Sequence, residues 1–152
     1  MHKQFAKIWK GDVYRAHQND GVISFEFYSY RELIFEAIDD SGKFLAKFIT
    51  ESEAIVFKVI LRELLMNAVT HGNRSNEELI VRGSVEYLGD KNFKISVEDE
   101  GNGFAHSIDA DGAQDFPYRI KRKGYLLINR LSEQILFNDR GNRVIVYLTA
   151  KA

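Results

Sequence analysis

The order of strand-forming and helix-forming segments limits this chain of 152 residues to few folds. β-Branched and aromatic residues in partial alternation predict strands, whereas apolar residues three or four positions apart predict helices. We expect strands at 22–28, 79–88, 93–98, 135–138 and 143–149, and helices at 30–49, 50–70 and 125–132. This order favours an α+β fold: a two-layer α/β sandwich whose single sheet is mixed, mostly antiparallel, and covered by helices on one face.

Length and composition fit one globular domain. A chain of this size buries enough surface for one core, and 45% hydrophobic with 28% charged residues argues against disorder. We separate an N-terminal extension, residues 1–21, whose structure the sequence leaves open, from a domain at 22–152. The absence of cysteine excludes disulfides, a thiolate nucleophile and cysteine-ligated metals.

Charge and hydropathy restrict the partners and the compartment. The formal net charge of −1 gives no support for direct binding of nucleic acid. No stretch approaches the roughly 20 apolar residues of a membrane span, and no apolar run near Met1 resembles a signal peptide. We therefore expect a cytoplasmic protein that does not bind membranes.

The second predicted helix is mostly apolar but contains a polar pair, Glu63 and Asn67. It should begin within Thr50-Glu51-Ser52-Glu53, with Thr50 or Ser52 as N-cap, and end near Gly72. Its segment 55–69 is apolar on nearly every side, which predicts a central, buried helix. Glu63 and Asn67 are four residues apart and therefore neighbours on the helix surface. A carboxylate and a carboxamide oxygen at this spacing suit Mg²⁺, which takes few protein ligands. The alternative is an ordinary polar pair on a solvated face.

A glycine-containing turn follows the strand at 93–98. It reads Asp99-Glu100-Gly101-Asn102-Gly103-Phe104. Two spaced glycines let a planar or phosphorylated ligand approach bare backbone closely, and the Asp99 carboxylate would accept a hydrogen bond from an exocyclic amine such as that of adenine. The alternative is a plain turn rich in aspartate and glycine.

Basic residues gather before the last predicted helix. Gly124 opens this helix, so its backbone amide is suited to hold phosphate oxygens. The polar segment 105–123, which we expect to be a long loop, supplies Arg119, Lys121, Arg122 and Lys123. The alternative is a solvated basic turn or a patch for an acidic partner.

These three elements together resemble the Bergerat-type ATP-binding fold shared by DNA gyrase, the ninety-kilodalton heat-shock chaperone, sensor histidine kinases and mismatch-repair ATPases. Within it they most resemble the small anti-sigma-factor serine kinases of bacteria. The matching motifs are ELLMNAVTHG at 63–72, DEGNGF at 99–104 and KGYLLI at 123–128, and GNRV at 141–144 falls where the family closes its sheet. The resemblance covers roughly residues 22–149 and identifies 22–152 as a histidine-kinase-like ATP-binding domain.

The resemblance implies a site for ATP and Mg²⁺. Glu63 would be the catalytic general base or water-orienting carboxylate, Asn67 would hold Mg²⁺ through its side-chain oxygen, and Asp99 would bind the adenine amino group. Segment 105–123 would be a lid over the phosphates. The other cofactor-binding residues would be Gly101, Gly103, Arg122, Lys123 and Gly124.

Two residues depart from the family pattern. Arg122 stands where the third motif usually has the first of two glycines, and Asn142 stands where a threonine often touches the adenine pocket through water. Arg122 would either restrict the backbone or supply a cation to the phosphates. These departures concern nucleotide affinity and turnover more than the fold.

The resemblance further implies an anti-sigma regulatory factor. Such a protein binds a sigma factor and, with Mg-ATP, phosphorylates a serine of an anti-anti-sigma protein; a homodimer is a further possibility. One alternative is a partner-switching module with weak or absent catalysis, which Arg122 and Asn142 favour. Another is a detached sensor histidine kinase domain, but neither His2 nor His17 lies in a convincing long amphipathic helix.

Overall fold

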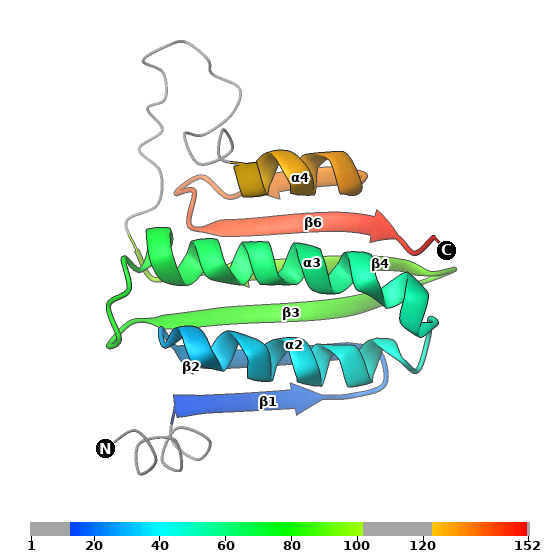
Figure 1. Cartoon of the computed structure of the whole chain (residues 1–152), viewed down its shortest axis with the longest axis horizontal. Helices are drawn as coiled ribbons and strands as arrows, with labels where there is room; N and C mark the ends of the chain where they lie inside the picture. Colours follow the sequence, from blue (N-terminus) through cyan, green and yellow to red (C-terminus); the bar gives the residue numbers. More distant parts are fainter. Residues whose placement is uncertain (1–12, 102–122, 152) are drawn as a thin grey trace.

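A six-stranded sheet covered by helices on one face organises the described part of the chain (Figure 1). The computed structural model describes residues 13–101 and 123–151. The strands are β1 Tyr14–Gln18, β2 Val22–Tyr28, β3 Ile80–Gly89, β4 Asn92–Glu98, β5 Gln134–Phe137 and β6 Arg143–Thr149. The helices are α2 Arg31–Leu45, α3 Glu51–Asn67 and α4 Lys123–Leu131, and a π-helical turn, Ala68–Gly72, continues α3.

The strands lie in the order β1-β2-β3-β4-β6-β5, and every pairing among the described strands is antiparallel. The predicted α+β two-layer fold is thus confirmed, with a more uniform sheet than the mixed one expected. Consecutive strands are joined by short hairpins or by the helices. In the hairpin between β3 and β4, Asp90 and Lys91 both have positive φ, the backbone of a type I′ turn, whose twist matches that of the strands.

β1 lies within residues 1–21, whose structure the sequence left open. It is an edge strand that pairs with β2, from Tyr14 opposite Phe27 to Gln18 opposite Ile23. The Tyr14 hydroxyl donates to the Asp40 carboxylate on α2 at 2.6 Å. Burial, and then this hydrogen bond, raise the pKa of the Tyr14 phenol. The strand is therefore tied to the helix layer as well as to the sheet.

The core lies between the sheet and the helices, because alternate strand residues face α2 and α3. On β2, buried Ile23, Phe25 and Phe27 alternate with less buried or exposed residues. Burying one such side chain contributes roughly 1.5–3 kcal/mol. The same alternation on the other long strands buries Val81, Val85, Phe93, Ile95, Val97, Val144, Val146 and Leu148.

α3 lies between α2 and α4 in the helix layer (Figure 1). Of the two predicted N-caps, the structure has Thr50: its side chain accepts from the Glu53 amide, and the Glu53 carboxylate accepts from the Thr50 amide. The prediction of burial on nearly every side is wrong for the outer face, where Ile55 is 58% and Val59 37% exposed. Only one helix layer covers this sheet face, so nothing among the described residues packs over them.

The ion pair between Glu53 and Lys91 fastens the β3–β4 hairpin to the start of α3. The Lys91 ammonium lies 2.7 Å from the nearly buried Glu53 carboxylate. The hydrogen bond from Lys91, and then the one from the Thr50 amide, lower the pKa of Glu53 below its ordinary value of 4.5. A lowered folded-state pKa contributes stability that is complete above the unfolded pKa and is lost as pH falls through the folded one.

We therefore expect Lys91→Met to lower the free energy of unfolding at neutral pH, and to do so less as pH falls below 4.5. Urea unfolding of both proteins over a pH series measures the difference. The matched control is Lys151→Met, which removes an exposed lysine. A Lys91→Met effect that stays the same across the series would contradict this role of the ion pair.

Candidate functional site

The C-terminal end of α3, which carries the polar residues, continues into a π-helical turn instead of ending as an α-helix. After Asn67 the chain widens into the π-helical turn Ala68–Gly72, and the Asn73 amide donates to the Ala68 carbonyl at 2.8 Å. π-Helical turns occur frequently at functional sites. The sequence predicts the helix end near Gly72 but not this widening, because the π-turn alters only the last turn of a helical pattern.

The first and second motifs are in direct contact at this end of α3. A Cβ added to Gly72 would lie 2.1 Å from the Asp99 carboxylate, and one added to Gly101 would lie 1.9 Å from the Gly72 carbonyl oxygen. Only glycine leaves room for such an approach. Two stretches that are far apart in sequence are thus packed backbone to backbone.

Asp99 is buried directly after β4. Its carboxylate oxygen Oδ1 accepts from the Gly101 amide at 2.9 Å, which closes the turn. Its backbone is bonded to Asn142 in both directions: the Asp99 amide donates to the Asn142 carbonyl at 2.9 Å, and the Asn142 side chain donates to the Asp99 carbonyl at 2.8 Å. The position of this carboxylate is therefore determined by several bonds.

Asn67 and Glu63 lie one helical turn apart on α3. Asn67 is only 7% exposed, and its side-chain nitrogen has no hydrogen-bond partner among the described residues. Leaving a buried amide nitrogen without a partner is costly, so this N–H group is suited to donate to a water or to a ligand oxygen, whereas Mg²⁺ would be held by the side-chain oxygen of Asn67. Glu63 is half-buried and forms a 3.4 Å ion pair with Arg62. A partly exposed pair of this kind contributes little and leaves the carboxylate available.

The donor set suits a magnesium ion that arrives with a nucleotide. Within residues 13–101 and 123–151, no group of three or more histidine, aspartate or glutamate residues is placed to hold a metal ion. Mg²⁺ keeps most of its water and phosphate ligands and needs only one or two oxygens from the protein. The side-chain oxygen of Asn67 meets that limited requirement, which leaves the Glu63 carboxylate for the catalytic role that the resemblance implies.

The third motif begins α4. Lys123 and Gly124 are its first two residues, so their amides belong to the helix N-terminus. The end of α3, the end of β4 and the start of α4 lie at the same end of the sheet (Figure 1). Gly103, Arg122 and the predicted lid up to residue 122 lie outside the described residues.

The match to a known family agrees with these motifs. A model of the histidine kinase-like ATPase domain matches residues 27–148, which include all three motifs. The chain belongs to the histidine kinase-like ATPase domain family. No curated protein matches it.

Membership of this ATPase family supports a nucleotide ligand, usually one with Mg²⁺, at the site that the motifs form. None of the described helices is both long enough and apolar enough to cross a bilayer.

Sequence reasoning overlooked two residues of this ATPase-family site. Asn73 directly follows the first motif but belongs to none of the motifs, and Asn142 departs from the family pattern. Both are buried and bonded to the Asp99–Gly101 turn. The sequence shows a polar residue directly after the first motif and another inside GNRV at 141–144, and neither position tells which backbone group the side chain will bond.

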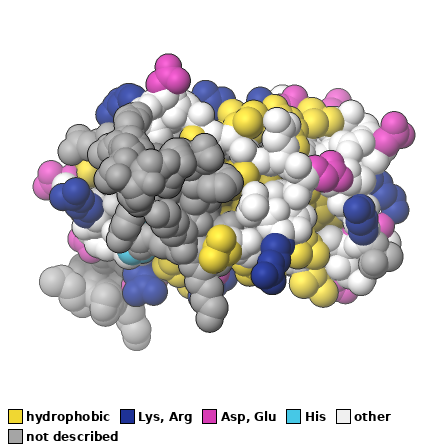
Figure 2. Space-filling model, turned by 90° about the horizontal axis from the view of Figure 1, so that it is seen from above, with side chains coloured by type: hydrophobic (Ala, Val, Ile, Leu, Met, Phe, Trp, Pro, Cys, Tyr) yellow, Lys and Arg dark blue, Asp and Glu magenta, His cyan; other side chains and the backbone are white. Residues whose placement is uncertain are grey.

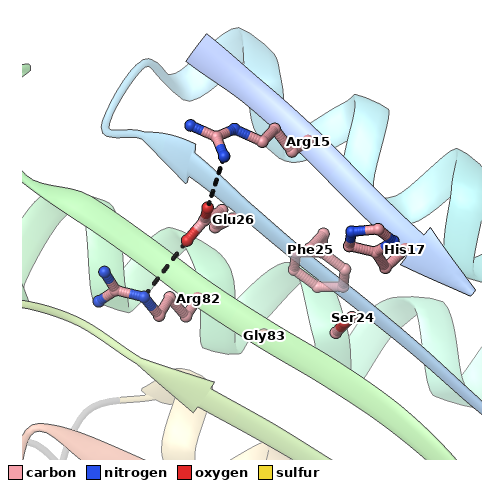
Figure 3. Close-up of a pocket in the computed structure, with 7 residues that line it drawn as sticks. All are labelled: Arg15, His17, Ser24, Phe25, Glu26, Arg82 and Gly83. Atoms are coloured by element: carbon pink, nitrogen blue, oxygen red, sulfur yellow. Dashed lines mark ion pairs between the residues drawn. The ribbon is translucent and has the colours of Figure 1, made fainter. Parts of the chain in front are cut away.

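A separate hollow of about 350 Å³ lies on the sheet face that the helices leave uncovered (Figure 3). At its edge, the Glu26 carboxylate lies 3.8 Å from Arg15 and 3.3 Å from Arg82. Across the next strands, Arg82 lies opposite Glu98 and Glu98 lies opposite Arg143, so residues of opposite charge alternate from strand to strand. Arg15 and Arg82 are both paired with the Glu26 carboxylate, and no predicted site residue lines the hollow, so we do not assign the nucleotide to it.

Proposed function

We propose that this protein is an anti-sigma-type regulator that binds Mg-ATP and phosphorylates a serine of an anti-anti-sigma partner. The observation that carries the proposal is the contact between Gly72 and Asp99, which joins the end of the first family motif to the start of the second. The Asn67 amide without a partner among the described residues lies one turn before that contact. Cytoplasmic location, a sigma factor as second partner and a possible homodimer belong to the same proposal.

In the proposed reaction, the serine hydroxyl oxygen attacks the γ-phosphorus of ATP. The bond from that phosphorus to the β,γ-bridging oxygen breaks, and ADP leaves with that oxygen. The Glu63 carboxylate accepts the hydroxyl proton. Asn67 would hold Mg²⁺ through its side-chain oxygen, and the bound ion would supply charge neutralisation at the phosphates. Phosphoryl transfer of this kind depends mainly on positioning and on charge neutralisation.

The surface around α4 and β5 supports a protein partner. Hydrophobic side chains reach the surface on this side of the molecule (Figure 2). Among the described residues, the exposed ones on α4 and β5 are Leu126, Leu127, Leu131 and Leu136. Apolar side chains grouped at a surface are typical of protein-binding sites.

The decisive experiment is a calorimetric titration with ATP, with and without Mg²⁺, on the wild-type protein and on Asp99→Asn. We expect Mg²⁺-dependent binding by the wild type. Asp99→Asn exchanges the carboxylate for a neutral amide, and losing a hydrogen bond to a charged group should weaken binding about tenfold to a hundredfold. No binding by the wild type at millimolar ATP would contradict the proposal.

A second candidate is a partner-switching module without catalysis. It is favoured by Asn142, whose side chain is bonded within the protein to Asp99 and Asn138 rather than left for a ligand. Incubation with radiolabelled ATP and an anti-anti-sigma protein separates the two candidates, because only the kinase labels a serine. A sensor kinase role is less well supported, since His17 lies on strand β1 and not on a dimerisation helix.

A further inference from the structure

Two buried carboxamides hold the turn that carries Asp99, one from each side. Asn73 reaches it from the end of α3, and Asn142 reaches it from the start of β6. Asn73 lies outside the matching motifs, and Asn142 stands at the family position of a threonine that often touches the adenine pocket through water, yet here its side chain is bonded to the Asp99 backbone. We propose that Asn73 and Asn142 are positioning residues that set where the Asp99 carboxylate meets the nucleobase, an inference that rests on the proposed ATP-binding function.

Asn73 connects three segments through one side chain. Its oxygen accepts from the Glu100 amide at 2.8 Å, directly after Asp99. Its nitrogen donates to the Ser29 hydroxyl at 2.8 Å, after β2, and to the Ile80 carbonyl at 3.1 Å, at the start of β3. The Asn73 amide is buried, and both its oxygen and its nitrogen are hydrogen-bonded. It therefore fixes the turn after Asp99 relative to the ends of β2 and β3.

Asn142 fixes the other side of the turn. The two bonds between Asn142 and Asp99, one of them from the Asn142 side chain, close a ring between the end of β4 and the start of β6. The Asn138 side chain in turn donates to the Asn142 side-chain oxygen at 2.8 Å, on the side of the amide that faces away from Asp99. The longer side chain at this family position therefore reaches the Asp99 backbone.

The two anchors act on the same short segment. Asn73 holds the amide after Asp99, and Asn142 holds the carbonyl of Asp99 itself. On the side of Gly72, no space remains for the carboxylate to move. Loss of either anchor should let the turn shift, and a shifted carboxylate would no longer align with an amino group on the base, whereas contacts to the phosphates would remain.

A pair of nucleotides tests this separation. Inosine triphosphate has the same phosphates as ATP but carries an oxygen where adenine carries its amino group. We expect the wild type to bind ATP at least about tenfold more tightly than inosine triphosphate, since the hydrogen bond involves a charged acceptor. In Asn73→Ala and Asn142→Ala this ratio should fall several-fold toward one, measured by titration calorimetry.

Two control variants each remove a neighbouring bond and keep both anchors. Ser29→Ala removes the hydroxyl that accepts from Asn73, and Asn138→Ala removes the amide that donates to Asn142. Both should keep the wild-type preference for ATP. A general loss of stability would change the fraction folded for all four variants but not the ratio between two nucleotides.

Amide hydrogen exchange by NMR, without nucleotide, tests the anchors independently of the proposed function. We expect Asn73→Ala to exchange the Glu100 amide at least about tenfold faster, because the substitution removes the acceptor of that amide. Asn142→Ala keeps the backbone carbonyl that accepts from the Asp99 amide, but it loosens the turn by removing the bond to the Asp99 carbonyl, so the Asp99 amide should also exchange faster than in the wild type. The controls should leave both amides protected. If the wild type binds no nucleotide, the proposed function fails and these rates alone decide on the anchors. Wild-type protection in either alanine variant, or a wild-type nucleotide ratio in a variant that binds ATP, overturns the inference.

Discussion

The Gly72→Ala variant is expected to bind ATP about tenfold to a hundredfold more weakly than the wild type. The added Cβ would lie 2.1 Å from the Asp99 carboxylate, so the buried carboxylate has to leave its position. The variant keeps every charged group, and any loss therefore reports geometry alone. Titration calorimetry with Mg-ATP measures the affinity, and far-UV circular dichroism checks that the fold is retained.

The control for this substitution is Gly21→Ala, because a Cβ at Gly21 meets no atom within 4 Å. It should bind ATP as the wild type does. Gly101→Ala should reproduce the loss seen with Gly72→Ala, since its Cβ would meet the Gly72 carbonyl oxygen from the opposite side of the same contact. Wild-type affinity in Gly72→Ala would show that the contact between the two motifs does not position the nucleotide.

The second large effect concerns stability. Phe57 on α3 is 2% exposed, and its ring meets that of Phe93 on β4 edge to face, with centroids 4.8 Å apart. Phe57→Ala removes this contact between the layers and leaves a cavity, so we expect a loss of about 3–5 kcal/mol in the free energy of unfolding. Urea unfolding followed by circular dichroism measures it.

Phe35→Ala on α2 is the matched control, because Phe35 is 53% exposed. Removing it should change the free energy of unfolding by no more than about 0.5 kcal/mol. Equal losses in the two variants would mean that the packing of α3 on the sheet is not what stabilises this fold.

The secondary structure was largely predictable because its signals are local. The capping box of Thr50 and Glu53 marks the start of α3 in four consecutive residues, and the structure contains both of its bonds. β2 extends over the predicted residues 22–28. The alternation of residue types along this segment is a local signal that indicates both the strand and the face that it buries. β1 escaped prediction, since a short edge strand with mostly exposed residues has no such alternation.

The candidate site was predictable only as a set of residue types. Asn67, Asp99 and Gly101 stand out because each chemical group suits a nucleotide or its metal. Their spatial relation depends on Gly72, whose role is visible only when the Asp99 carboxylate is seen against it. The exposed Ile55 and Val59 illustrate the same limit, since a helical pattern does not tell how many layers cover a helix.

By itself, the sequence determined the element order, the fold class and the three motifs, because propensity, capping and periodicity act between residues that are near in the chain. The tertiary structure alone decided that Asn73 and Asn142 hold the Asp99 turn from two sides. Their bonds join segments 27 and 43 positions apart in the chain. A hydrogen bond between such distant residues exists only after the sheet has set the register that brings them together.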